Sequence, residues 1–390
     1  MSHPEQVYKA LRLWLDGPSG LDEAIRRTVG GGLFTEQDVQ FAVAHLRESL
    51  TPDVLERWWK RAGYAPDHDS IRPPMKILCL HAGNLPLVGL QDVVAVLLSG
   101  NQYYGKLSRK DPWLIASFVD VCRELGLPEA AGCNTELGSF SGLQADAVLF
   151  TGSDKSVPGV LDELLRLKVV NRQSQTRYLI RTAQLSVAVV RKKQSAGELL
   201  EAITRYDGRG CRSVGVVVSP YSLDDYAEAL RLAAGAGPPS GLMNGPKKYL
   251  HAYAVAAGLP CLQLFDGRWL FIESDDTGLI REGVVLWIRG GEEELENVRN
   301  RLSGRIQTVF TDDEEVAGVA KEADEAELAG DADLTDEAEV AEVAEEADKA
   351  ELAGHDEIES LKKAQLPEFD WSPDGVDTLQ WLKVRITCGG

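Results

Sequence analysis

The feature that most constrains the fold is an alternation of short apolar segments with helix-length segments between residues 75 and 310. Apolar runs typical of strands occupy 75–80, 102–107, 147–150 and 186–190, and segments with helical periodicity fill 86–98, 112–125 and 157–167. Short apolar strands separated by helices of this length are typical of a parallel sheet that is covered on both faces. The sequence therefore predicts an α/β fold.

The same alternation continues towards residue 310. We expect helices at 196–206, 222–234, 247–257 and 292–302, and strands at 214–218, 284–288 and 306–310. The runs 262–265 and 269–273 are expected to form a hairpin, because Asp266 and Gly267 make a favourable turn pair between them. Residues 5–62 have apolar and charged positions at helical spacing, so a helical region is expected over residues 1–70.

Negative charge is concentrated in one segment of the chain. The net charge of the 390 residues is −20, but residues 311–360 hold 21 Asp and Glu against two Lys, and the rest is close to neutral. This segment is also a duplication, because residues 311–330 recur as 335–354 with 15 of 20 positions identical. Its Ala and Glu favour a helix, but its apolar area is too small for a core. We therefore expect a helical or disordered acidic insert over 311–360, with a docking surface for a basic partner as the alternative.

One glycine-rich segment, GRGCRS at 208–213, holds a candidate nucleophile. A cysteine on such a turn is accessible, and the flanking Arg209 and Arg212 favour the thiolate, which is the reactive form. The segment falls at the junction of two α/β regions, where ligand clefts tend to form. Cys211 is therefore a candidate catalytic residue, and the alternative is a small buried apolar cysteine.

The other cysteines indicate no metal site and no disulfide scaffold. None has the Cys-x-x-Cys or Cys/His spacing of a zinc site. Scattered thiols without a signal peptide are typical of a protein in the reducing cytoplasm. No apolar run is long enough to span a bilayer, and no nucleic-acid partner is expected.

Two strand ends have residues suited to an anionic ligand. Thr151, Gly152 and Ser153 end one expected strand and open a helix, where backbone amides can meet a phosphate. Such residues are also common as helix caps. Lys106 and Ser108 follow another strand, and the lysine could reach ribose or phosphate oxygens, although exposed lysines usually have no such role.

Asn84 follows the first expected strand, where its side-chain amide could point into a site above the sheet. An Asx-turn is the alternative role. Farther along, the chain has no acidic residue between Glu163 and Glu198, whereas eight residues of this stretch are basic. A phosphate-bearing ligand or a solvated basic face would explain the basic residues.

Taken together, these blocks resemble the acyl-CoA reductase family, which includes the reductase component of the bioluminescence fatty-acid reductase complex and has the aldehyde dehydrogenase fold. The similar blocks are AGNLPLVG at 82–89, LSGN at 98–101, KLS at 106–108, TGS at 151–153, IR at 180–181, SVAV at 186–189, GRGCRSV at 208–214, AQLP at 364–367 and GVDTLQWL at 375–382.

The resemblance implies a Rossmann-type dinucleotide-binding domain over 71–207, a catalytic domain over 208–310, and a C-terminal segment, 361–390, that packs back on the core. It implies that Cys211 is the nucleophile and that Asn84, with the backbone N–H of the cysteine, forms the oxyanion hole. The positions expected to bind the cofactor are Lys106 and Ser108 near the adenosine ribose and Thr151, Gly152 and Ser153 under the phosphates.

The implied activity is NAD(P)H-dependent reduction of a fatty acyl-CoA, expected to be long-chain, or of another acyl thioester, to the aldehyde through an acyl-cysteine. Ordinary aldehyde dehydrogenases activate water with a glutamate upstream of the cysteine, and the stretch 164–197 lacks one, so the acyl-enzyme should survive until hydride arrives.

Two alternatives remain for the activity. One is a CoA-acylating dehydrogenase for short-chain aldehydes, and the other is a non-catalytic protein of this fold whose acidic insert binds a partner. NADP is the expected cofactor, because the basic stretch could meet a 2′-phosphate, and NAD is the alternative. A homo-oligomer is expected, with an acyl-activating or acyl-transferring enzyme as a possible partner.

Overall fold

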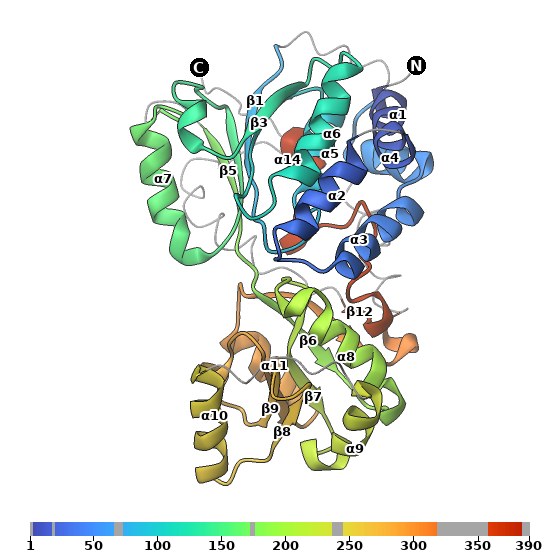
Figure 1. The fold of residues 1–390 in the computed structure, drawn as a ribbon, viewed down its shortest axis with the longest axis vertical. Coiled ribbons are helices and arrows are strands. Elements are labelled where there is room, and N and C mark those ends of the chain that lie inside the picture. Colours follow the sequence, from blue (N-terminus) through green and yellow to red (C-terminus); the bar gives the residue numbers. More distant parts are fainter. Residues whose placement is uncertain are drawn as a thin grey trace, which may run out of the picture. The chain divides into compact units, whose positions relative to one another are not determined.

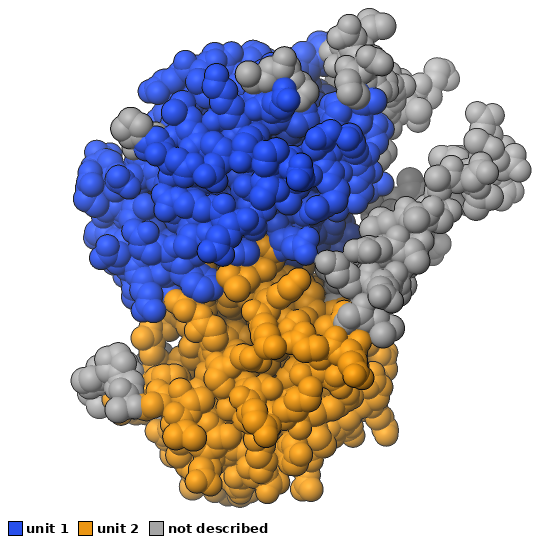
Figure 2. Space-filling view, turned by 90° about the vertical axis from the view of Figure 1, so that its right-hand side faces the viewer, with its two compact units in different colours: residues 1–182, 368–390 blue, residues 183–367 orange. Residues whose placement is uncertain are grey.

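The computed structural model describes residues 3–17, 20–65, 73–171, 176–235, 245–317 and 358–383. The chain forms two compact units, shown in separate colours in Figure 2. Unit 1 comprises Met1–Thr182 and Glu368–Gly390, and unit 2 comprises Ala183–Pro367. The expected acidic insert lies outside the described residues from 318 to 357.

Unit 1 is built on a parallel sheet of five strands in the order β3-β2-β1-β4-β5. Strands β1, β3 and β5 are labelled in Figure 1. The strands predicted at 75–80, 102–107 and 147–150 are confirmed, and two further strands complete the sheet. The five strands are β1 (Lys76–Leu80), β2 (Gln102–Lys106), β3 (Ala130–Asn134), β4 (Ala147–Thr151) and β5 (Arg177–Arg181).

Helices cover both faces of this sheet, as predicted. On one face Ile77 and Leu149 join a core cluster with helices α5 (Leu90–Leu98) and α6 (Trp113–Glu124). On the other face Leu78 and Val148 join a cluster with α7 (Val157–Arg166). This division follows the period-two alternation of strand side chains. Helix α5 begins later than the predicted residue 86, because Gly89, with φ 89°, is in the left-handed region immediately before it.

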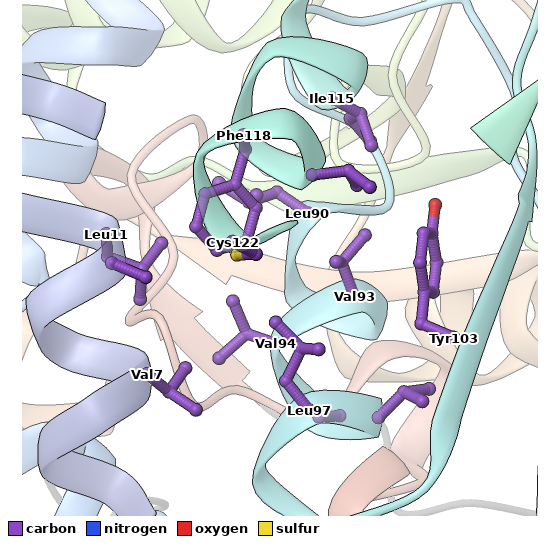
Figure 3. Close-up of a cluster of buried hydrophobic side chains, with 14 of the residues drawn as sticks. Val7, Leu11, Leu90, Val93, Val94, Leu97, Tyr103, Ile115, Phe118 and Cys122 are labelled. Atoms are coloured by element: carbon purple, nitrogen blue, oxygen red, sulfur yellow. The ribbon is translucent and has the colours of Figure 1, made fainter. Parts of the chain in front are cut away.

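The predicted N-terminal helical region is confirmed and packs into the core of unit 1. Its four helices are α1 (His3–Asp16), α2 (Leu21–Gly30), α3 (Glu36–Ser49) and α4 (Pro52–Arg61). Val7 and Leu11 of α1 point towards Phe118 of α6 and Val94 of α5 (Figure 3). The helices therefore bury their apolar sides against the same cluster as the sheet, and they are not a separate domain.

The C-terminal segment expected over 361–390 is divided between the units. Residues from Glu368 belong to unit 1, where helix α14 (Thr378–Lys383) packs beside β5, and the Arg177 guanidinium lies 4.0 Å from the centroid of the Trp381 ring. The Trp58 indole N–H donates to Asp377 Oδ1 at 2.9 Å. Residues 361–367 belong to unit 2 instead.

Unit 2 is built on a seven-stranded sheet in the order β12-β11-β6-β7-β10-β9-β8. All neighbouring strands are parallel except the β8–β9 pair, so the predicted hairpin is confirmed, with the turn at Phe265, Asp266 and Gly267. The strands are β6 (Leu185–Val189), β7 (Val214–Ser219), β8 (Cys261–Leu264), β9 (Trp269–Glu273), β10 (Val284–Arg289), β11 (Ile306–Thr311) and β12 (Ile358–Ser360).

Helices again cover both faces of this second sheet. Helices α8 (Ala196–Thr204) and α9 (Leu223–Ala234) pack with Val217 and Trp287 on one face. Helices α10 (Gly245–Ala256) and α11 (Glu292–Arg301) pack with Val216 and Leu286 on the other. The described residues also form short 3-10 helices: η1 (Leu137–Phe140), η2 (Asp154–Ser156), η3 (Lys193–Ser195), η4 (Arg205–Gly208), η5 (Thr277–Leu279), η6 (Leu361–Lys363) and η7 (Pro373–Gly375).

The boundary between the units differs from the one expected at 207/208, because the chain divides between Thr182 and Ala183. Strand β6 and helix α8, expected in the first domain, belong to unit 2, because β6 pairs with β7 and β11. Within the described ranges, no helix is long and apolar enough to cross a membrane. The same ranges contain no group of three or more His, Cys, Asp or Glu arranged to hold a metal ion.

Candidate functional site

Strand order places two candidate segments at one edge of the unit 1 sheet. The chain continues from β1 to β2 on one side and later returns to β4 on the other, so the direction of winding reverses between β1 and β4. Ligands of open α/β sheets bind outside the carboxyl ends of the strands at such a point. Asn84 lies in the loop after β1, and Thr151 is the last residue of β4.

The loop that contains Asn84 is held by close backbone contacts. Its first residue, His81, is buried, and its Nε2 is hydrogen-bonded to the Tyr103 hydroxyl at 2.8 Å. A Cβ on Gly89 would lie 2.0 Å from His81 Nδ1, and a Cβ on Gly83 would lie 2.2 Å from Ser108 Oγ. Glycine is therefore required at both positions for the loop to adopt this path.

The His81 imidazole is neutral at physiological pH. Burial lowers its pKa to about 4, because the desolvation of a charged imidazole outweighs the attraction of Asp92. A small pocket beside the loop has His81, Leu85, Leu87 and Ser108 among its lining residues.

Lys106 and Ser108 lie beside the Asn84 loop. Lys106 ends β2 opposite Leu80 of β1, and its backbone carbonyl accepts the His81 N–H at 3.0 Å. Its side chain is half-buried, and burial, together with the charge of Arg109, lowers the pKa of its ammonium group. The structure thus brings Asn84, Lys106 and Ser108 to one part of the sheet edge.

The segment after β4 differs in part from the expectation. The Gly152 N–H donates to the Arg181 carbonyl at 3.1 Å, so it is already satisfied within the sheet. Helix α7 begins only at Val157, after the 3-10 turn η2, and Pro158 in its first turn has no N–H to offer. The side chains of Thr151 and Ser153 remain as groups that could meet a phosphate, whereas the Gly152 N–H is not available and the first turn of α7 does not follow the strand directly.

Several of the described basic residues between 166 and 193 have partners within their own unit. Arg181 is buried and pairs with Asp92 at 2.7 Å, and Arg166 pairs with Glu163 at 2.6 Å. The Lys192 ammonium group donates to the Asp312 carbonyl at 3.0 Å, and Arg172 lies outside the described residues. Arg166, Arg181 and Lys192 thus have partners within the protein, which weakens the sequence argument for a 2′-phosphate site.

Cys211 lies in unit 2, immediately before β7, on a tight and strained turn. Tyr206 and Asp207, both non-glycine residues, have φ values of 53° and 60°, and Gly208 follows with φ 66°. A Cβ on Gly208 would lie 2.3 Å from the Trp269 ring. Consecutive residues in this sparsely populated region cost free energy, and such strain is concentrated at functional sites.

The backbone on both sides of the Cys211 thiol is fixed by hydrogen bonds. The Ser213 N–H donates to the Gly210 carbonyl at 3.0 Å, and the Gly210 N–H donates to Ser213 Oγ at 3.3 Å. Ser186 of β6 is fully buried and donates its hydroxyl to the Cys211 carbonyl at 3.0 Å. Cys211 itself is half-buried.

The two arginines beside Cys211 are paired with carboxylates. Arg209 Nη2 lies 3.0 Å from Asp207 Oδ2. Arg212 forms a bidentate pair with Glu359, with two N–O distances of 2.7 Å. Because these carboxylates balance their charge, the arginines provide less support for a thiolate than the sequence indicated.

The residues that hold the turn were not predicted from the sequence. In the sequence, Ser186 belongs to an expected strand and a similar block, Gln365 to another such block, and Glu359 to the acidic insert. The charged pair Arg212–Glu359 joins positions far apart in the chain, and no local pattern reveals it. A weak signal existed for Ser186, which is a polar residue in an otherwise apolar strand.

Comparison with known proteins shows the fold. No protein-family model matches the chain, and no curated protein sequence matches it. Among solved structures, an oxidoreductase from Marinobacter aquaeolei matches with a TM-score of 0.58 and 15% identity, over 81% of this chain and 74% of that one. Aldehyde dehydrogenase 21 from Physcomitrella patens, in complex with the reaction product succinate, matches with a TM-score of 0.57 and 14% identity, over 83% and 76% of the two chains.

A third match is a bifunctional proline utilization A (PutA) protein, with a TM-score of 0.52 and 18% identity. It covers 79% of this chain, but this chain spans only 38% of the length of that protein. At these identities the likeness concerns the fold. The chain therefore has the α/β fold of aldehyde dehydrogenases, as expected, with Asn84, Lys106 and Thr151 in unit 1 and Cys211 in unit 2.

Proposed function

We propose that this protein reduces an acyl thioester, with a long-chain fatty acyl-CoA as the expected substrate, to the aldehyde with NAD(P)H through an acyl-cysteine on Cys211. The observation on which the proposal rests is the Cys211 turn, which presents a half-buried thiol on a backbone held by Ser186 and Ser213. The aldehyde dehydrogenase fold of the chain supports an oxidoreductase that acts at an aldehyde carbon or its thioester precursor.

The first step belongs to Cys211. Its thiolate attacks the thioester carbonyl carbon, a C–S bond forms to the enzyme, and the bond to the coenzyme A sulfur breaks, so that coenzyme A leaves and takes up a proton. Negative charge develops on the carbonyl oxygen and must be met by hydrogen-bond donors. In this proposal the donors are the Asn84 side-chain amide and the Cys211 backbone N–H.

The unit 1 edge fits a dinucleotide in part. Winding reverses between β1 and β4, and the half-buried Lys106 ammonium and the hydroxyls of Ser108, Thr151 and Ser153 lie at the ends of β2 and β4. These groups would hold the ribose and phosphates of the cofactor. The Gly152 N–H would not take part, because it donates to the Arg181 carbonyl. Bound NAD(P)H would supply the hydride that reduces the acyl group.

The stretch before Cys211 in which ordinary aldehyde dehydrogenases hold a water-activating glutamate contains no carboxylate. Residues 164–197 contain no Asp or Glu. The carboxylate nearest to Cys211 in sequence, Asp207, forms ion pairs with both Arg209 and Arg268. A carboxylate held in this way is a poor general base, so hydrolysis of the acyl-enzyme is expected to be slow.

A second candidate function is a CoA-acylating dehydrogenase that uses the same residues on short-chain aldehydes, in either direction. The observation in its favour is that the similar solved structures include several aldehyde dehydrogenases. A non-catalytic protein with a partner-binding acidic insert remains the alternative from another class. The expected cytoplasmic location, homo-oligomer and acyl-donating partner enzyme remain predictions.

The test is steady-state turnover of short-, medium- and long-chain acyl-CoAs with NADPH and with NADH. We expect aldehyde and free coenzyme A in equal amounts, and a higher rate with long chains. Asn84→Ala should lower kcat by about 100- to 1000-fold if its amide stabilises the oxyanion. Oxidation of free aldehydes to acids without coenzyme A, and no reduction of any thioester, would contradict the proposal.

The matched control for the nucleophile is Cys261→Ala. Cys261 is also a half-buried thiol of unit 2, and burial, together with the charge of Asp224, raises its pKa. Cys211→Ala should abolish turnover, whereas Cys261→Ala should leave it unchanged. Equal loss in both variants would point to a structural effect and not to a nucleophile.

A further inference from the structure

The residue after Cys211 is held by a segment far away in the chain. Arg212 is buried, and its guanidinium forms two 2.7 Å bonds with the Glu359 carboxylate of β12. Its Nε donates to the Ala364 carbonyl at 2.9 Å and its Nη2 to the Lys363 carbonyl at 3.1 Å. The guanidinium carbon also lies 5.1 Å from the centroid of the Phe310 ring. The planar fork of arginine therefore has acceptors on two sides, which a lysine could not reproduce.

The same segment also holds the backbone of Arg212. Gln365 Nε2 donates to the Ala202 carbonyl of α8 at 3.0 Å and to the Arg212 carbonyl at 3.5 Å. One side chain thus links the end of the helix before the turn to the turn itself. Residues 359–365, here called the clamp segment, bond both the side chain and the carbonyl of Arg212.

The Cys211 carbonyl is held by a second element, strand β6, which is the direct neighbour of β7 in the sheet. Ser186 of β6 bonds it through its hydroxyl, and the Ser186 N–H donates to the Ser213 carbonyl at 2.9 Å. With the carbonyls of residues 211, 212 and 213 all accepting hydrogen bonds, the peptide planes around the thiol have little freedom. The Cys211 N–H shares a peptide plane with the Gly210 carbonyl, which accepts the Ser213 N–H at 3.0 Å, so its direction is restrained as well.

Resting on the function proposed above, we propose that Arg212, Glu359 and Gln365 are positioning residues that hold the Cys211 turn in the conformation in which the thiol reacts. They act through Arg212 and its peptide planes and do not need to touch the substrate. A displacement of about 1 Å in a reacting group can cost on the order of 100-fold in rate, so loss of the clamp should slow every reaction of the Cys211 thiol.

Alkylation by iodoacetamide tests this role without any acyl substrate. The rate of modification at Cys211 is followed by peptide mass over a range of pH in the full-length protein. Glu359→Gln removes the charge of the pair but keeps its shape, and Gln365→Met removes the two hydrogen bonds without burying a charge. We expect alkylation of Cys211 to slow by about 10- to 100-fold in both variants. The limiting rate at high pH should fall, and the affinity for NAD(P)H should be unchanged.

The matched control is Glu201→Gln. Glu201 pairs with Arg205 at 2.6 Å near the end of α8, close to the same turn in sequence, and Arg205 contacts one oxygen of its carboxylate through both Nε and Nη2. This control should alkylate at the wild-type rate. If Glu359→Gln does not fold, Gln365→Met decides the question. This substitution leaves the buried ion pair between Arg212 and Glu359 in place.

The outcomes separate the two proposals. Folded variants with a wild-type alkylation profile would overturn the positioning role, and so would a wild-type Cys211 that reacts no faster than free cysteine. A wild-type Cys211 that is alkylated rapidly but forms no adduct with any acyl-CoA would contradict the proposed function. The positioning role would then be judged by the variants alone.

Discussion

The imidazole of His81 occupies the space in which Gly89 would carry a side chain: a Cβ on Gly89 would lie 2.0 Å from His81 Nδ1. These residues are the first and last of the loop that contains Asn84, and helix α5 starts directly after it. The two ends of the loop are therefore held together because the buried His81 ring packs directly on the backbone of Gly89. Its shape, and with it the position of Asn84, depends on both residues.

Gly89→Ala should destabilise the protein more than Gly100→Ala. Both glycines have left-handed φ values, 89° and 70°, but only Gly89 faces a close neighbour, because nothing lies within 4 Å of a Cβ on Gly100. The backbone strain alone costs about 1–3 kcal/mol at either site. The measurement is the free energy of unfolding in urea, and equal losses in the two variants would show that the His81 contact does not constrain the loop.

The buried His81 should make stability depend on pH below neutrality. Its pKa in the folded state is about 4, below the value of about 6.5 for an exposed imidazole. As the pH falls from about 6.5 to about 4, the unfolded chain binds a proton that the folded protein does not, so the free energy of unfolding decreases by up to about 3 kcal/mol. Above pH 6.5 this residue does not change the free energy of unfolding with pH.

Replacement of His81 by Gln should remove this part of the pH dependence of the free energy of unfolding. The measurement is urea unfolding of the wild type and of His81→Gln at several pH values between 7.5 and 4.5, with His251→Gln on α10 as the control. A wild-type slope that persists unchanged in His81→Gln would assign the effect to other groups.

The buried pair of Asp92 and Arg181 should be worth more to stability than an exposed pair. Arg181 of β5 bonds Asp92 of α5 at 2.7 Å and also bonds Thr378 of α14, and both charged side chains are only 6% exposed. Asp92→Ala leaves a buried guanidinium without its counter-ion and should cost about 3–5 kcal/mol. Glu163→Ala, which breaks the exposed pair with Arg166, is the control and should have a small effect. Similar losses in urea unfolding would contradict this difference.

Removal of the acidic insert should leave Cys211 reactive only if the residues at its two ends are kept. Asp312 accepts the N–H groups of Arg191 and Lys192, and Glu359 pairs with Arg212. A variant in which a short Gly/Ser linker replaces residues 318–357 should keep wild-type alkylation and turnover. A deletion that extends through Glu359 should lose both. Loss of activity in the shorter, folded deletion would show that the insert takes part in function.

The sequence predicted most of the sheet strands but not those with mixed composition. Apolar β-branched runs such as 214–218 identify strands without help from the rest of the fold. Strand β3, with the sequence AAGCN, has no such run, and β5 begins and ends with arginines. Arg177 and Arg181 are accommodated by Trp381 and Asp92, which are distant in sequence, so their burial could not be predicted locally.

The candidate site could be predicted where one short segment contains both the reactive residue and the glycines that shape its turn. The glycines around Cys211 indicated a tight turn, and Gly208 does have a left-handed φ. The arginines beside it indicate a thiolate when the sequence is read locally, whereas in the structure they pair with the carboxylates of Asp207 and Glu359. The hydrogen-bond partners of the turn come from β6 and the clamp segment, and tertiary structure alone brings these together.

Intact-mass analysis of the protein after incubation with acyl-CoAs, without NAD(P)H, tests the central claim most directly. The proposed mechanism predicts a mass increase equal to one acyl group in the wild type and in Cys261→Ala, none in Cys211→Ala, and loss of the adduct with release of aldehyde when NAD(P)H is added. No adduct with any thioester, or an adduct that persists in Cys211→Ala, would contradict it.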